Sequence, residues 1–394
     1  MKSKRDTVCF VTTSFPRYDG DFFGSCPYNF TKELSKRYKI VVVTHGLPKA
    51  SNYEKIGGVD VFRFRWLYPK NFIALVHYSN WWFFRLITYL ISGFFTSLYV
   101  VSKFRARYIQ VFFTIPSGFI AILVGKILKK PVFVMPLGSD LREFITHPIF
   151  KHLVKYVLKE ATCLMIGPDE LKNYVLHNYG ISEDKIYFVP NAIDTKRFDG
   201  MKRPLQDLNN DKNFKVLFLG RLVEFKNPTL FVRAMPKILQ KNSDISFYIA
   251  GDGPLRTEVE KLVDELNIER NVKMLGTLDY ALMPGLLSSV DVATFLSEIE
   301  NFGTAMMESM SSERAIIATN VGCIDEAIDN NHSGILIDNN PESLAKAILK
   351  LVSNKEMCHT LGKNARKFII DNHSIEKSCD KISEIYSSHS NSNH

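Results

Sequence analysis

The chain has 394 residues, of which 46% are hydrophobic and 23% are charged, and its formal net charge at pH 7 is +9. This length suits two domains of ordinary size, and the hydrophobic fraction is enough to bury a sizeable core. The six cysteines are scattered, and no two have the CxxC spacing of a metal or redox site. The basic first residues lead into a short strand-like segment rather than a long apolar run. We therefore expect no secretion signal and a cytoplasmic protein.

The positive charge is concentrated in one part of the chain. Between Asp60 and Asp140 there is no Asp or Glu, whereas ten Lys and Arg residues lie in this stretch. A basic patch attracts nucleic acid, anionic lipid or phosphate-bearing substrates. The apolar residues between these charges argue against a nucleic-acid groove, which needs exposed aromatic rings on a polar surface.

Short runs rich in β-branched residues alternate with helical stretches in the first half of the chain. A helix is expected over 28–38. Strands are expected at 8–13, 40–44, 109–114, 132–136, 163–167 and 186–189. This order predicts a parallel sheet with helices on both faces.

The segment 86–102 has no charged residue, and its 17 residues are at the lower limit for a membrane-spanning helix. Its Thr, Ser and Gly residues weaken that interpretation, so a buried or interfacial helix is favoured. Aromatic residues at 81–84 stand directly before Arg85, a combination that suits the headgroup region of an anionic membrane surface. We expect peripheral binding at the inner face of the cell membrane, with an ordinary core helix and solvated cations as the alternative.

A polar stretch at 199–213 has the composition of a linker. After it, helices are expected at 228–240 and 254–266. Strands are expected at 215–220, 246–250, 272–275, 292–296, 315–319 and 334–337. The predicted fold class is α/β, with two Rossmann-like doubly wound domains at 1–198 and 214–372 that face each other across a cleft. A C-terminal helix at about 373–388 is expected to pack back on the first domain. Ligands of such sheets bind beyond the carboxyl ends of the strands.

Two glycine turns in the second half follow predicted strands. Gly220 is followed by Arg221 and Lys226, and two cations near a helix start suit a diphosphate. Gly251 and Gly253 stand in Ala250-Gly-Asp-Gly-Pro-Leu255, where Pro254 fits the first position of a helix. Solvated cations and a purely structural turn are the alternatives for these two motifs.

A third motif places two carboxylates eight residues apart. Glu300 and Glu308 flank a turn that opens a helix, and its intervening residues include Asn301, Phe302, Gly303 and Thr304. Carboxylates accept hydrogen bonds from sugar hydroxyls. The alternative is that Glu300 caps the helix and Glu308 is solvated. A further glycine turn at 319–326 supports the architecture more than the chemistry.

Taken together in their order, these motifs resemble the Glu-x7-Glu pattern and its neighbours in the retaining glycosyltransferase family 4, which has a glycosyltransferase B-type fold. In the first half, Gly20-Asp-Phe-Phe-Gly-Ser25, Pro116-Ser-Gly118, Gly138-Ser-Asp140 and Val189-Pro-Asn-Ala-Ile-Asp194 are similar to the acceptor-domain motifs of this family. The resemblance covers nearly the whole chain.

The resemblance implies a role for each matched residue. Arg221 and Lys226 would hold the diphosphate of the donor, Glu300 the donor sugar and Glu308 the ribose. Asp140 is grouped with Arg221, Lys226 and Glu300 as a candidate catalytic residue. The other implied donor-binding residues are Gly24, Gly220, Gly251, Gly253, Asn301, Phe302, Gly303 and Thr304. Those on the acceptor side are Gly20, Asp21, Ser25, Gly138 and Ser139.

The implied activity is transfer of a sugar, with retention, from a nucleotide sugar to a lipid-linked or glycan acceptor. No metal or cofactor is implied, and a UDP-sugar is slightly favoured over a GDP-sugar. One residue departs from the pattern: many members have His where this chain has Leu137. Asp140 and the backbone would then take over that contact, or the activity is altered. A non-catalytic sugar-nucleotide-binding protein and a sugar-nucleotide epimerase are therefore the alternatives.

Overall fold

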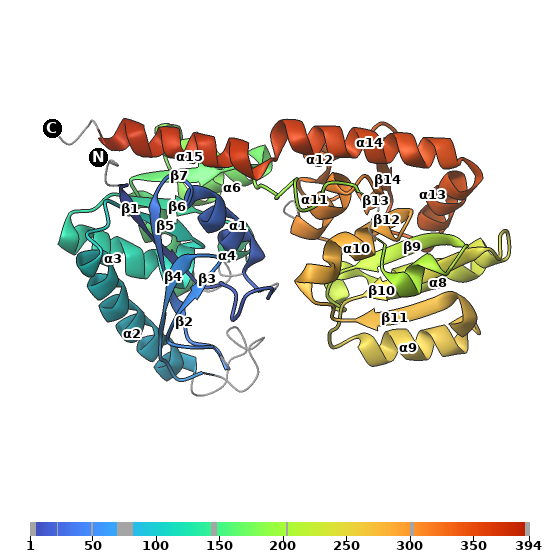
Figure 1. Ribbon diagram of the computed structural model, residues 1–394, viewed down its shortest axis with the longest axis horizontal. Coiled ribbons are helices and arrows are strands. Elements are labelled where there is room, and N and C mark those ends of the chain that lie inside the picture. The colour runs from blue at the N-terminus through green and yellow to red at the C-terminus, as the bar shows by residue number, and fades with distance from the viewer. Residues whose placement is uncertain are drawn as a thin grey trace. The chain divides into compact units, whose positions relative to one another are not determined.

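The computed structural model describes residues 5–21, 23–48, 50–68, 82–142, 148–201, 204–299 and 303–390. The chain forms two compact units (Figure 1). The first contains residues 1–190 and 376–394, and the second contains residues 191–375. Each unit has one sheet with helices on both faces, so the α/β prediction of two Rossmann-like domains is confirmed.

The sheet of the first unit has eight strands in the order β3-β4-β2-β1-β5-β6-β7-β8. All neighbours pair in parallel except β3 and β4, which form an antiparallel hairpin. The strands are β1 (Thr7–Thr12), β2 (Lys39–His45), β3 (Tyr53–Ile56), β4 (Val59–Phe64), β5 (Tyr108–Phe112), β6 (Val132–Met135), β7 (Cys163–Ile166) and β8 (Ile186–Phe188). The strand order reverses direction between β1 and β5, which makes this the topological switch point.

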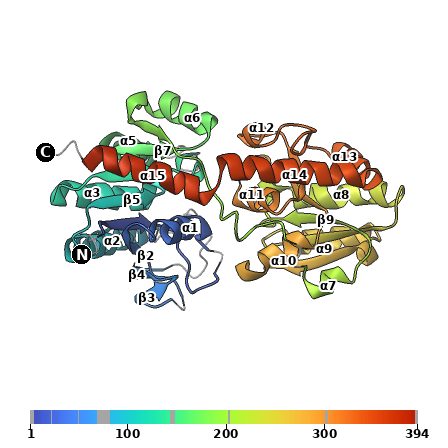
Figure 2. The same cartoon turned by 45° about the horizontal axis from the view of Figure 1, so that its top comes forward.

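Two sets of helices cover the two faces of this sheet. The helices are α1 (Ser25–Leu34), α2 (Trp82–Lys103), α3 (Phe119–Leu128), α4 (Ser139–Arg142), α5 (Pro148–Glu160), α6 (Asp169–Tyr179) and, from the end of the chain, α15 (Ile375–Ser390). Alternate residues of each strand serve alternate faces: Cys9 and Val11 pack toward α2 and α3, and Phe10 packs against Phe112, which also contacts Phe30 of α1. Figure 2 shows α15 lying along the first unit between α1 and α6.

The sheet of the second unit has six parallel strands in the order β11-β10-β9-β12-β13-β14. They are β9 (Phe214–Leu219), β10 (Ile245–Ala250), β11 (Val272–Gly276), β12 (Val292–Phe295), β13 (Ala315–Thr319) and β14 (Ile335–Ile337). The helices are α7 (Gln206–Asn209), α8 (Pro228–Leu239), α9 (Arg256–Glu265), α10 (Met283–Ser288), α11 (Thr304–Ser311), α12 (Ile324–Ala327), α13 (Pro341–Ser353) and α14 (Lys355–Asn372). This is the Rossmann strand order, and its switch point lies between β9 and β12.

The stretch predicted as a linker lies inside the second unit. Leu208 of α7 is 2% exposed and belongs to the core beside α10, and Tyr248 of β10 donates a hydrogen bond of 2.7 Å to Asp211. These contacts tie the segment to the second sheet in spite of its polar composition. The chain passes between the units at Pro190–Asn191 and again at Ile375–Glu376.

Helix α2 contains the uncharged segment and is long and apolar enough to cross a membrane by length and composition. One face of it is packed in the part of the chain that the structure describes: Tyr89, Val100 and Val101 are at most 1% exposed and belong to the core under β2 and β4. The other face leaves Phe95 62% exposed. The helix is therefore neither solvated all round nor buried all round.

Candidate functional site

The candidate donor site lies at the carboxyl ends of the strands of the second unit, at the switch point between β9 and β12. Gly220 follows β9, and its N–H donates to the carbonyl of Ala250 at 3.0 Å. A Cβ atom built on Gly220 would meet nothing within 4 Å, so this glycine faces open space. Such a position lets a ligand approach the backbone closely.

The glycines after β10 have a different surrounding, because they pack against the loop after β9. A Cβ atom on Gly251, which has φ +140°, would lie 1.9 Å from the carbonyl oxygen of Gly220. A Cβ atom on Gly253 would lie 2.4 Å from the carbonyl oxygen of Leu222. Backbone hydrogen bonds of 3.0 Å, from Leu222 to Asp252 and from Leu255 to Leu222, join the two loops. Because Gly251 and Gly253 have no Cβ atom, the loop after β10 can pack directly against the loop after β9.

Arg221 and Lys226 gather around one aromatic ring. The Arg221 guanidinium lies 5.4 Å and the Lys226 ammonium 5.6 Å from the centroid of the Phe225 ring. Both distances suit cation–π contacts, which hold the cations without neutralising them. Two positive charges are therefore kept near each other at the end of β9.

This loop is tied to the loop after the neighbouring strand β12. The Phe225 carbonyl accepts from the N–H of Glu298 at 2.8 Å, and the side chain of Asn227 donates to the carbonyl of Leu296 at 3.1 Å. The chain then reaches Gly303, the N-cap of α11, whose carbonyl accepts from the N–H of Met306. The first N–H groups of a helix lack intrahelical partners and favour an anion. Both flanks of the switch point therefore offer positive potential.

Glu308 of α11 is 4% exposed and accepts a hydrogen bond of 2.6 Å from the hydroxyl of Tyr280. Burial raises the pKa of Glu308 to about 7, although the Tyr280 hydrogen bond and the charge of Arg197 act in the opposite direction. Arg197 lies 4.0 Å from the centroid of the Tyr280 ring and donates to the Tyr280 carbonyl at 2.7 Å. The alternative in which Glu308 is solvated is wrong, because Glu308 belongs to this buried cluster.

Three of the expected donor residues, Glu300, Asn301 and Phe302, lie outside the described residues. Thr304 is the first residue of α11 and is half-buried. The donor-binding roles of these residues, and of Gly303 and Glu308, stay predictions.

In the first unit, three of the expected acceptor residues, Gly20, Asp21 and Ser25, lie in the loop from β1 to the first residue of α1, together with the expected donor residue Gly24. Gly20 and Gly24 have φ values of 94° and 71°, which favour glycine. A Cβ atom on Gly24 would lie 2.5 Å from the backbone nitrogen of Phe15, so the loop folds tightly onto the end of β1. Ser25 begins α1 and is half-buried.

Asp21 closes this loop. It is 4% exposed, and its two oxygens accept hydrogen bonds of 2.7 and 2.9 Å from the Arg17 side chain and one of 2.9 Å from the Arg17 backbone. Burial raises the pKa of Asp21, but the Arg17 hydrogen bonds outweigh it and leave the pKa below its usual value. In this structure Asp21 holds the loop in shape.

Asp140 connects the loops after β5 and β6. One oxygen accepts from the N–H of Thr114 at 2.6 Å, and the other accepts from Leu137 and Gly138 at 3.0 Å each. Asp140 is 3% exposed, and burial raises its pKa against the effect of these hydrogen bonds. Gly138 has φ 98°, Leu137 is half-buried, and the backbone of Ser139 begins α4. The structure gives Asp140 a positioning role, and its catalytic role stays a prediction.

Sequence reasoning missed the residues that hold these side chains in place, chiefly Phe225, Tyr280, Arg197 and Thr114. Phe225 stands between the two cations of a recognised motif, so its position in the sequence could have identified it. Tyr280 and Arg197 are 28 and 111 residues from Glu308. No local pattern joins them to it.

Comparison with known proteins agrees with this architecture. Residues 25–197 match the family described as "Glycosyltransferase Family 4", and residues 203–368 match "Glycosyl transferases group 1". N-acetyl-alpha-D-glucosaminyl L-malate synthase of Bacillus anthracis is 23% identical over 400 aligned residues, covering 98% of this chain and 97% of that protein.

Two further relatives are informative. UDP-Gal:alpha-D-GlcNAc-diphosphoundecaprenol alpha-1,3-galactosyltransferase of Escherichia coli is 26% identical over 248 residues, which cover 60% of this chain and 63% of that one. The structure of Anabaena HepE in complex with UDP and glucose superposes with a TM-score of 0.75 at 15% identity, covering 97% of this chain and 100% of that one.

Two doubly wound units, with a basic turn and a helix start at the switch point of the second, define a glycosyltransferase of the B-type fold. The chain belongs to the glycosyltransferase family 4-like proteins, as the two family matches across both units show. The epimerase and the non-catalytic alternatives are not favoured, since these relatives are named as transferases or synthases.

Proposed function

We propose that the enzyme transfers a hexose, with retention and without a metal, from a nucleotide sugar to a lipid-linked or polysaccharide intermediate of cell-surface glycan synthesis. The observation that carries the donor assignment is the pair of cations around Phe225 at the switch point of the second unit. A diphosphate leaving group gains negative charge as the sugar departs, and two adjacent cations stabilise that charge.

A UDP-sugar is the favoured donor, ahead of a GDP-sugar. HepE, which shares the fold, was solved with UDP and glucose, and the name of the Escherichia coli relative contains UDP-Gal and a diphosphoundecaprenol acceptor. These properties belong to those proteins, and they motivate the choice of substrates for the first assay.

The assay is incubation with a panel of UDP-, GDP- and ADP-sugars, with and without EDTA, followed by measurement of released nucleotide and NMR of the anomeric product. Arg221→Ala and Lys226→Ala should each lower kcat by roughly 10- to 100-fold, because each removes a charge-assisted contact that tightens in the transition state. Arg233→Ala, which removes an exposed cation from α8, is the matched control. Wild-type turnover in both site variants would contradict the donor assignment.

Peripheral membrane binding through α2 is the second part of the proposal. Phe84, Ile91, Phe95 and Tyr99 recur at helical spacing and are each at least 54% exposed, so they form one apolar stripe. Arg85 lies beside the start of the stripe and Lys103 beside its end. Exposed aromatic rings that can insert into a bilayer, with cations beside them, favour the headgroup region of an anionic membrane.

Co-sedimentation with vesicles tests this part. The protein should bind vesicles that contain an anionic lipid and should dissociate from them at high salt. It should not bind neutral vesicles. Phe95→Glu should abolish binding, whereas Leu282→Glu, at a position 44% exposed in the second unit, should not. Failure of the wild-type protein to bind anionic vesicles at low salt would exclude this mode of attachment.

A further inference from the structure

A second basic site lies at the opposite edge of the first sheet from the candidate acceptor loops. A hollow of about 1000 Å³ opens at the amino ends of β1, β2, β4 and β5. The acceptor loops follow the carboxyl ends of these parallel strands. The six residues of β1 alone separate the two edges by roughly 17 Å at the usual rise per residue. The hollow is thus distinct from the transferase site.

Cations dominate the described lining of this hollow. Five of them, Arg5, Lys39, Lys103, Arg105 and Arg107, face two carboxylates. Both carboxylates already have partners: Asp6 pairs with Arg107 at 2.8 Å, and Asp60 pairs with Lys55 at 3.7 Å and accepts from Tyr53 at 2.8 Å. The hollow therefore has an excess of positive charge.

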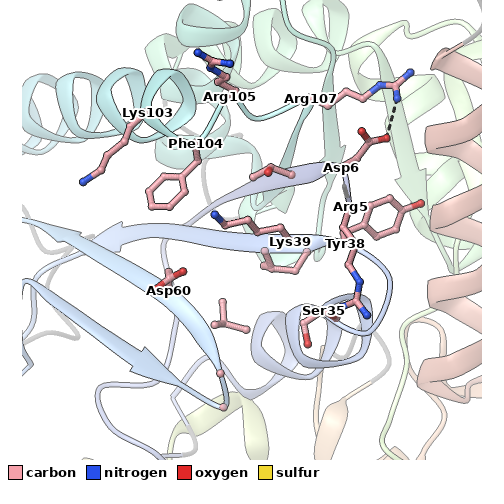
Figure 3. Close-up of a pocket in the computed structure, with 15 residues that line it drawn as sticks. Arg5, Asp6, Ser35, Tyr38, Lys39, Asp60, Lys103, Phe104, Arg105 and Arg107 are labelled. Carbon is pink, nitrogen blue, oxygen red and sulfur yellow. Dashed lines mark hydrogen bonds and ion pairs between the residues drawn. The ribbon is translucent and has the colours of Figure 1, made fainter. Parts of the chain in front are cut away.

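Lys39 and Lys103 are two of the four lining cations, with Arg5 and Arg105, that have no ion pair among the described residues. Their ammonium groups lie 4.9 and 5.8 Å from the centroid of the same ring, that of Phe104. Within the described ranges, neither takes part in an ion pair. Figure 3 shows Lys39 extending across the middle of the hollow, with Phe104 and Lys103 on one side and Asp6 on the other.

The end of α2 explains only some of these charges. A cation near the carboxyl end of a helix is stabilised by the helix dipole, and this accounts for Lys103 and Arg105. It does not account for Lys39 and Arg5, which come from β2 and from the segment before β1. Two ammonium groups that each lie within 6 Å of one ring centroid raise the positive potential around Phe104, and this potential favours a bound anion.

We propose that this hollow binds a phosphate-bearing anion, with Lys39 and Lys103 as its principal contacts. Lysine is a point-charge phosphate ligand, and the volume is large enough for a diphosphate or a phospholipid headgroup. The position of the hollow at the end of the exposed stripe of α2 places it within reach of both sources. This inference goes beyond the transferase activity and does not depend on it.

Isothermal titration with inorganic pyrophosphate tests the soluble source. Titrations are run in an Arg221→Ala/Lys226→Ala background, which removes both cations proposed for the donor site. Lys39→Glu should weaken the remaining binding by at least about tenfold, and Lys39→Arg should restore it because the charge returns. Lys241→Glu makes the same charge change at an exposed site in the second unit and should have no effect.

Vesicles of phosphatidylcholine with and without phosphatidate test the lipid source. A loss of phosphatidate-dependent binding in Lys39→Glu assigns the site to a headgroup. A loss confined to pyrophosphate assigns it to a soluble phosphate. Phe95→Glu should leave pyrophosphate binding intact, which separates this site from the membrane stripe. If Lys39→Glu and Lys241→Glu bind both probes equally, or if the wild-type protein binds neither, the proposal is overturned.

Discussion

Glu308 is a candidate binding residue whose ionisation also affects the stability of the second unit. Its carboxyl group is buried against Tyr280, and burial raises its pKa from 4.5 to about 7. Between these two values the folded protein retains a proton that the unfolded chain has lost. The contribution of Glu308 to stability is therefore complete below about pH 4.5 and is lost as the pH rises toward 7.

We predict that Glu308→Gln removes this pH dependence. The wild-type protein should lose roughly 3 kcal/mol of unfolding free energy from this group between pH 4.5 and 7, and the variant should not, since Gln cannot ionise but can still accept from Tyr280. Urea denaturation at several pH values measures the difference.

Glu258→Gln, at an exposed position of α9, serves as the control and should follow the wild-type pH profile. A wild-type profile in Glu308→Gln would show that the carboxyl titrates normally. Binding of a nucleoside diphosphate by the same variants tests the ribose role: equal affinity in Glu308→Gln and wild type would contradict it.

At the scale of elements, the glycines in the loops after β9 and β10 have different surroundings and different roles. Gly251 and Gly253 meet the backbone of the neighbouring loop, whereas Gly220 faces open space. We predict that Gly251→Ala lowers the unfolding free energy by about 1–3 kcal/mol, because the new Cβ atom forces the two loops apart at a positive φ. Thermal or urea denaturation measures this loss.

Gly220→Ala is the matched variant in the same pair of loops. It should fold as the wild type does, since its Cβ atom meets no protein atom, yet weaken donor binding where a diphosphate approaches the backbone. Normal stability in Gly251→Ala would refute the supporting role of that loop. Unchanged donor affinity in Gly220→Ala would place the donor elsewhere.

The elements also show which parts of the fold are predictable from sequence. The strands around both switch points were expected within one or two residues, because buried parallel strands are continuous apolar runs. The hairpin of β3 and β4 was missed, although Gly57-Gly58 at its turn is a recognised hairpin signal. Tyr53 and Lys55 on β3 are exposed, so the strand has no apolar run to reveal it.

The residues of the candidate site were also only partly predictable from the sequence. Arg221, Lys226 and Glu308 could be selected because they stand in local motifs at strand and helix ends. The partner of Glu308 could not be selected, because the pairing of Tyr280 with Glu308 depends on the path of the chain between β11 and α11. Asp140 was selected for its motif, but its contact with Thr114 depends on β5 and β6 being neighbours.

At the scale of the whole molecule, the last helix belongs to the first unit. Tyr386 of α15 is fully buried, stacks on Tyr108 with ring centroids 4.8 Å apart, and donates to Gln110 at 2.8 Å. Arg37 of the first unit forms an ion pair with Asp380. The core of the first unit is therefore complete only with residues that follow the second unit in sequence.

We predict that Tyr386→Ala destabilises the first unit by about 3–5 kcal/mol, because it leaves a large cavity and an unpaired buried amide. Tyr386→Phe keeps the ring and should lose only about 1–3 kcal/mol. Hydrogen exchange should show the loss of protection in β1, β5 and β6, with β9 and β12 much less affected. Equal loss in both sheets would show that the two units unfold together.

The origin of α15 also sets an order of events during synthesis. The ribosome synthesises β1 to β8 first and the second unit next. During this time the surface around Tyr108, Gln110 and Phe133 is not yet covered by α15. The second unit can complete its own sheet as soon as it emerges, so the half that is made first is finished last. A nascent chain of this enzyme thus exposes an aromatic surface until α15 has been synthesised, and a chain truncated before residue 375 leaves that surface exposed.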